Sequence, residues 1–304
     1  MQVKPITPRG YCKGVVRAIQ IAKESVNLPK PIYILGMIVH NQYIVDALTT
    51  MGIQTIDSKG STRLELLETI NEGTVIVTAH GASAQVFEKA KDKGLHIVDA
   101  TCPDVIVTHT IIKEYLTKGY EVLYIGKAGH PEAEGSLAID SKHVHLITNE
   151  KDIDTLSKDK KYVITNQTTM SFYDVFSICE YAKKQLPNLI IAKETCDATK
   201  VRQEAIASLD EDIDVVFIVG DPHSNNTKKL ANIAHDKAKK CVHMIESVSD
   251  ITLAMLKNAN VAAVSSGAST PTYLTNQVIS YLQQFDINDT STYATPSIDV
   301  NKII

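Results

Sequence analysis

The stretch Gly10-Tyr11-Cys12-Lys13-Gly14-Val15 places a cysteine between two glycines, where a short predicted strand (residues 3–7) leads into a helix. Apolar residues at helical spacing between residues 15 and 26 predict that helix. A cysteine in the first turn of a helix lies at the positive end of the helix dipole, which favours the thiolate that binds metals or attacks carbon. A small residue packed in a tight turn is the alternative, and this stretch alone does not separate the two.

Composition limits the classes of partner. The chain of 304 residues is long enough for two domains, and at 44% hydrophobic it can bury an ordinary core. Its net charge of −4 argues against nucleic acid and anionic membranes as partners. No apolar run approaches the roughly 18 residues of a membrane helix, and the first residues do not follow the signal-peptide pattern. The five cysteines form no C-x-x-C pair, which predicts a reducing, cytoplasmic location with free or metal-bound thiols.

A threefold repeat runs through the chain. Cys12, Cys102 and Cys196 are 90 and 94 residues apart, and each follows a predicted strand and precedes a predicted helix. The positions 24 residues further on are all glycines that end apolar strands, and the positions 28 residues further on are all polar: His40, His130 and Ser224. A second strand in each unit ends in polar residues, at 80–83, 166–169 and 266–269. A third strand then leads to the next cysteine.

The repeat predicts the architecture. Alternating strands and helices indicate an α/β fold, here three similar α/β units with mostly parallel sheets about a pseudo-threefold axis. The predicted units are residues 12–101, 102–195 and 196–285. The third unit lacks its closing strand, which we expect residues 1–11 to supply, and residues 286–304 form a polar tail outside the repeat.

The repeat also predicts a metal site. Parallel α/β sheets bind ligands at the carboxyl ends of their strands, where the three repeated cysteines stand. Three converging thiolates would hold a zinc ion with an open fourth position, or an iron–sulfur cluster with one iron free for substrate. The cysteine pattern alone fits both alternatives. Cys179 and Cys241 lie outside the repeat and are predicted to be core residues.

Polar groups at equivalent strand ends predict a phosphate-binding pocket, because hydroxyl, amide and imidazole groups that precede helices suit phosphate oxygens. The candidates are His40, His80, His130, Thr168, Ser224, Asn225, Asn226 and Ser269. Glu132 has no counterpart in the other two units. A carboxyl in a partly dry pocket has a raised pKa and can donate a proton, so Glu132 is the candidate acid. Glu134 is expected to point elsewhere.

Nine short motifs, in order and with fitting spacing, make residues 10 to 285 similar to the IspH (LytB) family of 4-hydroxy-3-methylbut-2-enyl diphosphate reductases. The motifs are Gly-Tyr-Cys12-Lys-Gly-Val, His40-Asn41, Ala79-His80-Gly81, Ala100-Thr-Cys102-Pro, Gly129-His130-Pro-Glu132, Gln167-Thr168-Thr169, Thr195-Cys196-x-Ala-Thr199 with Arg202-Gln203, Ser224-x-Asn226, and Gly267-Ala-Ser269-x-Pro271.

The resemblance implies a cytosolic enzyme that reduces an allylic diphosphate to isopentenyl and dimethylallyl diphosphates, the last step of the methylerythritol phosphate route, with electrons from a ferredoxin or flavodoxin. Its [4Fe-4S] cluster would be held by Cys12, Cys102 and Cys196, with the substrate hydroxyl on the open iron. Its diphosphate-binding residues would be His40, His80, Ser224, Asn226 and Ser269, with His130 in the same pocket. Asn225 stands where many members have serine. Glu132 would deliver the proton, assisted by Thr168 and His130.

A metal-dependent hydrolase of a diphosphate is the alternative function, with the open metal site activating water and Glu132 as the base. A reductase requires electrons and a hydrolase does not, so reductant dependence separates the two. A cluster-bearing sensor is a third class, and the many predicted phosphate donors argue against it.

Overall fold

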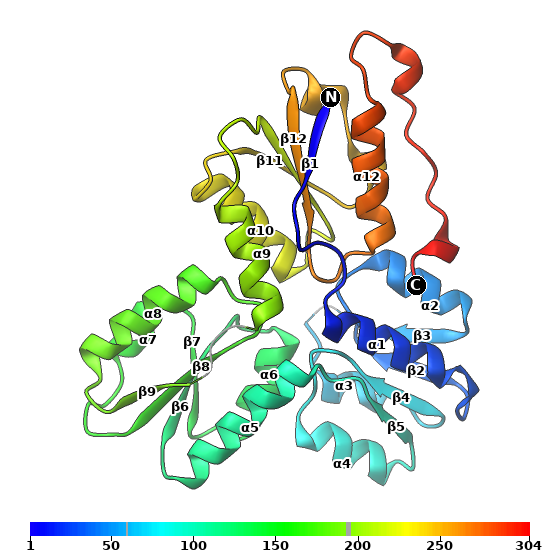
Figure 1. Ribbon diagram of the computed structural model, residues 1–304. Helices are drawn as coiled ribbons and strands as arrows, with labels where there is room; N and C mark the ends of the chain where they lie inside the picture. Colours follow the sequence, from blue (N-terminus) through cyan, green and yellow to red (C-terminus); the bar gives the residue numbers. More distant parts are fainter. Residues whose placement is uncertain (59, 193–195) are drawn as a thin grey trace. The chain divides into compact units, whose positions relative to one another are not determined.

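The computed structural model describes residues 1–58, 60–192 and 196–304 (Figure 1). Thr195 of the third cysteine motif, and the predicted boundary at that residue, lie outside the described residues. The chain forms two compact units. The first comprises Met1–Val15, His40–Ala47 and Asp197–Ile304, and the second comprises Val16–Val39 and Leu48–Cys196.

The first unit is built on one four-stranded parallel sheet with the order β1-β12-β10-β11. Its strands are β1 (Gln2–Pro5), β10 (Val215–Val219), β11 (Cys241–Ile245) and β12 (Val261–Ser266). Strand β1 pairs in parallel with β12, with Gln2 opposite Val261. The helices after Cys196 are α9 (Asp197–Ala207), α10 (Asn225–Asp236), α11 (Leu253–Leu256) and α12 (Thr272–Gln284), with 3₁₀ turns at Val248–Asp250, Thr290–Thr292 and Val300–Lys302.

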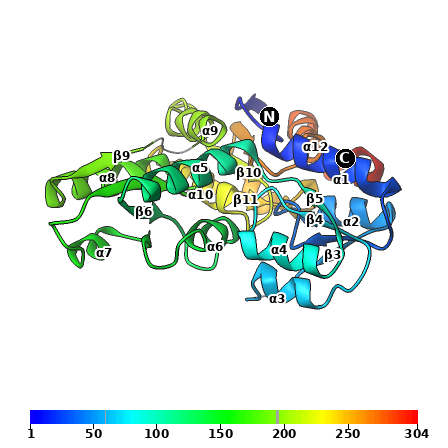
Figure 2. The ribbon, with the colours of Figure 1, turned by 90° about the horizontal axis from the view of Figure 1, so that it is seen from below.

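The second unit holds two parallel sheets, with the orders β3-β2-β4-β5 and β7-β6-β8-β9. The strands are β2 (Ile32–Leu35), β3 (Ile53–Ile56), β4 (Thr74–Val77), β5 (His96–Asp99), β6 (Glu121–Ile125), β7 (Val144–Ile147), β8 (Tyr162–Asn166) and β9 (Leu189–Ile191). The helices before Cys196 are α1 (Lys13–Glu24), α2 (Gln42–Thr50), α3 (Arg63–Glu68), α4 (Ala84–Asp92), α5 (Pro103–Thr117), α6 (Pro131–Leu137), α7 (Glu150–Asp154) and α8 (Phe172–Gln185), with a 3₁₀ turn at Ser25–Asn27. Helices α1 and α2 each have residues in both units. In Figures 1 and 2 helices line both faces of the β7-β6-β8-β9 sheet.

The predicted α/β fold class with three similar parallel sheets is confirmed. Each sheet has the same strand order. Strand β2 lies between β3 and β4, β6 lies between β7 and β8, and β10 lies between β11 and β12. Strand β1 lies beside β12 as β5 lies beside β4. The expected three strands per unit is wrong, since every sheet has four. The missed strands β3, β7 and β11 each form one edge of a sheet, and Gln54, His145 and His243 interrupt the apolar runs that would reveal them.

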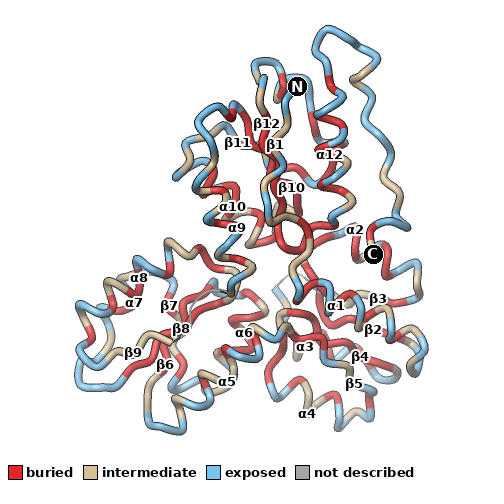
Figure 3. The backbone as a smooth tube through the Cα atoms, in the orientation of Figure 1, coloured by how far each residue is buried: buried red, intermediate tan, exposed pale blue. Residues whose placement is uncertain are grey.

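Alternation along β6 builds two cores. Leu123 and Ile125 face a core shared with α7 and α8, which also contains Cys179. Val122 and Tyr124 face the opposite core, shared with α5 and α6. Figure 3 shows β6 and its neighbour β8 as buried segments between more exposed helices. The prediction of a core position is therefore confirmed for Cys179, whereas Cys241 is exposed because β11 is an edge strand.

No helix within the described part of the chain is both long enough and apolar enough to cross a membrane. The longest of the helices described above, α5, has 15 residues.

Replacing Leu123 of β6 with alanine tests the assignment of this residue to the core. We expect Leu123→Ala to lower the free energy of unfolding by about 2–5 kcal/mol, because it removes buried methyl groups and leaves a cavity. Leu253→Ala removes the same atoms from an exposed side chain and should change it by less than about 0.5 kcal/mol. Urea denaturation of both variants measures the difference, and equal midpoints would contradict the assignment.

Candidate active site

The Glu132 carboxyl is the centre of the polar residues in the second unit. Glu132 is in the first turn of α6, is 1% exposed, and receives two hydrogen bonds from a single residue. The Thr168 backbone N–H donates to Oε1 at 2.7 Å, and the Thr168 hydroxyl donates to Oε2 at 3.0 Å. Glu132 follows β6 and Thr168 follows β8, and these strands are neighbours in one parallel sheet. The carboxyl ends of the two strands therefore bring the pair together.

Burial sets the charge of this carboxyl. Desolvation raises the pKa of Glu132 to about 7, the negative charge of Asp104 acts in the same direction, and the two Thr168 hydrogen bonds partly oppose both. At neutral pH a substantial fraction of the carboxyl therefore carries a proton that it can donate. This is the property that general acid catalysis needs near pH 7.

Two histidines extend this group of polar residues. His130 is the N-cap of α6, and its Nδ1 accepts the Glu132 backbone N–H at 3.2 Å. In the neutral ring this acceptor role leaves the proton on Nε2. The His80 ring meets the His130 ring edge to face, with centroids 5.4 Å apart. The structure therefore brings together His80, His130, Glu132 and Thr168, all of which were predicted as site residues.

The Gln167 side chain holds this group in place, a role that the sequence motif containing Gln167 did not assign to it. The buried Gln167 side chain accepts the Lys127 backbone N–H at 3.0 Å and donates to Thr169 Oγ1 at 2.7 Å, so it joins the loops after β6 and β8. Glu134 is engaged elsewhere, as expected, because its Oε1 accepts the Arg63 backbone N–H at 2.9 Å.

His109 supports the same group from α5. A Cβ added to Gly81 or Gly135 would come within 3.6 Å of its ring, so the imidazole packs between the His80 loop and α6. Gly81 also has a φ of +77°, which a residue with a side chain rarely adopts. Burial and the charge of Lys113 lower the pKa of His109, which favours the neutral ring.

Two buried hydroxyls lie on the core side of α6. Ser136 is one helical turn after Glu132 and so shares its face of the helix. The Ser136 Oγ and the Tyr124 Oη are buried without a hydrogen bond of normal geometry to any residue in the described ranges. Burial and the nearby charge of Glu132 raise the pKa of Tyr124, so its ring stays neutral and helps to keep the carboxyl dry.

The first unit gathers the other predicted substrate-binding residues. Ser224 is the N-cap of α10, and its hydroxyl lies 3.4 Å from that of Ser269. The Ser269 hydroxyl also donates to the His40 backbone carbonyl at 3.2 Å. Asn225 and Asn226 form the first turn of α10, where backbone N–H groups and the helix dipole favour anions.

The three repeated cysteines occupy equivalent local positions. Cys102 is the N-cap of α5, Cys12 directly precedes α1, and Cys196 directly precedes α9. All three are half-buried and outside any disulfide. The backbone N–H of Cys12 donates to Ala268 O at 3.1 Å and that of Cys102 to Ala79 O at 3.0 Å, in each case in the loop after the neighbouring strand. Thiolates at helix N-termini suit metal binding.

Residues 3–283 match a family model described as LytB protein. Curated proteins named 4-hydroxy-3-methylbut-2-enyl diphosphate reductase, from Exiguobacterium sibiricum and Bacillus subtilis, are 48% and 47% identical over this whole chain and 98% of their own lengths. A solved E-1-hydroxy-2-methyl-but-2-enyl-4-diphosphate reductase from Plasmodium falciparum is 32% identical, with a TM-score of 0.87 over 94% of this chain and 89% of its own.

The raised pKa of Glu132 predicts how stability depends on pH. Below about pH 4.5 the carboxyl is protonated in both the folded and the unfolded chain. Between there and about pH 7 only the unfolded chain loses the proton, so folding stability falls by up to about 3 kcal/mol as pH rises. Glu132→Gln lacks this titration. We therefore expect its urea midpoint, relative to that of the unsubstituted protein, to be higher at pH 8 than at pH 5.

Glu134→Gln is the matched control, because it removes a carboxylate two residues further along the same helix. It should track the unsubstituted protein at both pH values. A Glu132→Gln midpoint that also stays parallel to the unsubstituted protein would show that Glu132 titrates normally.

Proposed function

The chain belongs to the LytB protein family, and we propose that it reductively removes the hydroxyl of (E)-4-hydroxy-3-methylbut-2-enyl diphosphate. The products are isopentenyl and dimethylallyl diphosphates, in the last step of the methylerythritol phosphate route. Two electrons and two protons are consumed and one water is released. The observation on this chain that supports this chemistry best is the buried Glu132 carboxyl with a pKa of about 7, held by Thr168 at the ends of two adjacent strands.

We propose that Cys12, Cys102 and Cys196 hold a [4Fe-4S] cluster. Three half-buried thiols that each directly precede a helix fit this role, whereas Cys179 lies in a core and Cys241 on an exposed edge strand. The bound cluster would supply the two electrons one at a time. A ferredoxin or flavodoxin, both cytoplasmic one-electron carriers, is the proposed source of those electrons.

The proposed substrate contacts follow from the donor groups of each unit. Ser224, Asn225, Asn226 and Ser269 offer hydroxyl, amide and helix N-terminal N–H groups, which suit the oxygens of a diphosphate. His80 and His130 add imidazole donors, and we include His40 on the basis of its motif. All these residues lie at carboxyl ends of strands or at the starts of helices.

Proton delivery is assigned to Glu132. When the carboxyl is protonated, its O–H can donate to the Thr168 hydroxyl, which accepts and donates at the same oxygen. Thr168 therefore holds the acid in one orientation and offers an exit for its proton. His130 fixes the backbone of the same residue through Nδ1 and keeps a donor at Nε2.

The hydrolase alternative is not supported, because the full-length relatives are named reductases. The decisive assay supplies the allylic diphosphate to anaerobically reconstituted protein with and without a reduced electron donor. Conversion to the two isoprenoid diphosphates should occur only with the donor. Release of phosphate without a reductant would contradict the proposed function.

Glu132→Gln should lower turnover at least about 100-fold, because proton delivery by a positioned acid contributes roughly that factor or more. Unsubstituted protein should lose activity as pH rises through about 7, where the carboxyl gives up its proton. Glu134→Gln, with its side chain bound to the Arg63 backbone, should keep most activity. Steady-state rates at several pH values measure this, and full activity of Glu132→Gln would remove its assigned role.

Cys196→Ser should fail to retain four irons per chain after anaerobic reconstitution, because one thiolate ligand is lost. Cys179→Ser places the same change in a core helix and should leave the iron content unchanged. Iron and sulfide analysis with absorption spectra distinguishes them. Equal iron content in the two variants would exclude Cys196 as a ligand.

A further inference from the structure

The segment of residues 286–304, here called the strap, lies outside the repeat and has no place in the proposed reaction. It begins after α12 and returns along that helix (Figure 1). Figure 3 shows most of it as exposed. Such a segment would be expected to make few specific contacts, yet it is fixed at several points.

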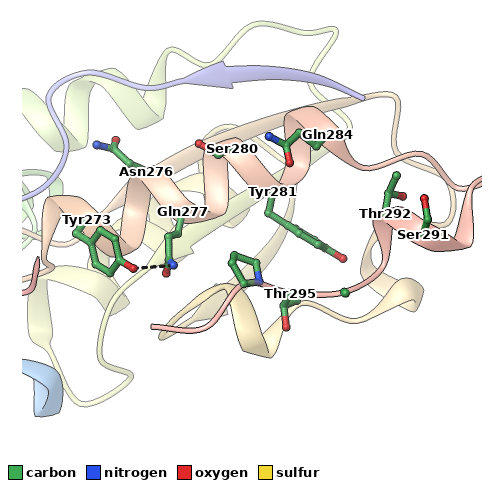
Figure 4. Close-up of a pocket in the computed structure, with 11 residues that line it drawn as sticks. Tyr273, Asn276, Gln277, Ser280, Tyr281, Gln284, Ser291, Thr292 and Thr295 are labelled. Carbon is green, nitrogen blue, oxygen red and sulfur yellow. Dashed lines mark hydrogen bonds between the residues drawn. The ribbon is translucent and has the colours of Figure 1, made fainter. Parts of the chain in front are cut away.

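The strap is attached along α12 by side chains of the helix that bind its backbone. The Gln277 amide donates to Ser297 O at 2.9 Å, and the Tyr281 hydroxyl donates to Tyr293 O at 3.2 Å. The Tyr273 hydroxyl accepts the Asp299 N–H at 3.2 Å. Between these attachments lies a cavity of about 740 Å³, and Figure 4 shows Tyr273, Gln277 and Tyr281 projecting from α12 along it. The strap is therefore held at separate points and not by continuous packing.

The far end of the strap reaches the residue before Cys12. The Tyr11 hydroxyl donates to Ile303 O at 2.7 Å. Ile303 is only 2% exposed, although Val300 in the preceding 3₁₀ turn is 39% exposed. The strap thus ends in a buried apolar anchor and in a hydrogen bond to residues 6–12, the loop between β1 and α1 that is here called the Cys12 loop.

The Cys12 loop is otherwise held through its backbone. Gly10 N–H donates to Ser266 Oγ at 2.7 Å, Gly10 O accepts from Arg202 at 3.0 Å, and Cys12 N–H donates to Ala268 O. Gly10 has a φ of +73°, and a Cβ there would meet the Thr272 hydroxyl at 2.4 Å, so this approach requires glycine. Tyr11 carries the side chain that ties the loop to the strap.

We propose that the strap positions Cys12 as a cluster ligand, with Tyr11 and Ile303 as its positioning residues. The proposal rests on the proposed function, because it concerns a thiolate that would hold the [4Fe-4S] cluster. Restraining the residue next to a ligand limits how far its sulfur can move away, so the strap slows opening of the loop and release of iron. A strap that merely stabilises the first unit would not act selectively on the Cys12 loop.

The test compares single substitutions with matched controls on the same strap. Tyr11→Phe removes only the hydroxyl that binds Ile303 O, and Tyr293→Phe removes a similar hydroxyl that binds Ile287 O within the strap. Ile303→Asp places a charge at the buried anchor, and Val300→Asp places one at an exposed neighbour. All variants are reconstituted anaerobically, and iron release to a chelator is followed by absorbance.

We expect Tyr11→Phe to release iron about fivefold faster than unsubstituted protein, the factor that corresponds to one hydrogen bond of ordinary net strength. Ile303→Asp should release it at least as fast, and both controls should match the unsubstituted protein. Equal rates in Tyr11→Phe and Tyr293→Phe would overturn the proposal.

Amide exchange in cluster-free protein gives a readout that is independent of the proposed reaction. The protected N–H groups of Gly10 and Cys12 should exchange faster in Tyr11→Phe and Ile303→Asp, with no change in the β10 amides. Unchanged protection at Gly10 and Cys12 would overturn the positioning role. If unsubstituted protein binds no iron, the proposed function fails, while the exchange measurement still decides whether the strap restrains this loop.

Discussion

Desolvation of the Glu132 carboxyl is the constraint on which the arrangement of the second unit depends. Both of its oxygens take their hydrogen bonds from Thr168, so the loops after β6 and β8 must keep a fixed spacing. Parallel pairing of the two strands sets that spacing, and the Gln167 side chain maintains it by bonding to both loops. A looser connection would admit water, return the pKa of Glu132 toward its ordinary value, and leave a weaker acid–base partner near neutral pH.

The core of this unit and its candidate acid are products of the same alternation. Because side chains of β6 point to opposite faces, Val122 and Tyr124 pack under α6 while Leu123 packs under α7 and α8. The face of α6 that packs against β6 is buried, and Glu132 and Ser136 are buried with it because they share that face. Stability therefore conflicts with function at one position, since the carboxyl is buried at a cost that grows as pH rises.

The sequence predicted the repeated features of the fold, and it missed the contacts that support the candidate site. The spacing of Cys12, Cys102 and Cys196 was sufficient to place each cysteine between a strand and a helix. Glycines and polar residues recur at the same distances after each of the three. Strands β3, β7 and β11 were missed because polar residues interrupt their apolar runs, and the edge position of β11 makes the prediction for Cys241 wrong. His109 gave no signal, and Gln167 stood in a motif without a role, because its contact with the Lys127 backbone joins residues distant in sequence.

The strap shows the limit of such prediction most directly. Its attachments join side chains of Tyr11, Gln277 and Tyr281 to backbone carbonyls of the strap, and a carbonyl is the same whichever residue carries it. Composition therefore identifies residues 286–304 only as polar, and no pattern within them encodes the contact with the Cys12 loop. What the sequence does carry is the apolar pair Ile303 and Ile304 at the end of a mainly polar segment. The structure gives Ile303 a reason, since its burial brings its carbonyl to Tyr11. The stretch around Cys12 is thus restrained from both sides: by Ser266, Ala268 and Arg202 through its backbone, and by the strap through the Tyr11 side chain.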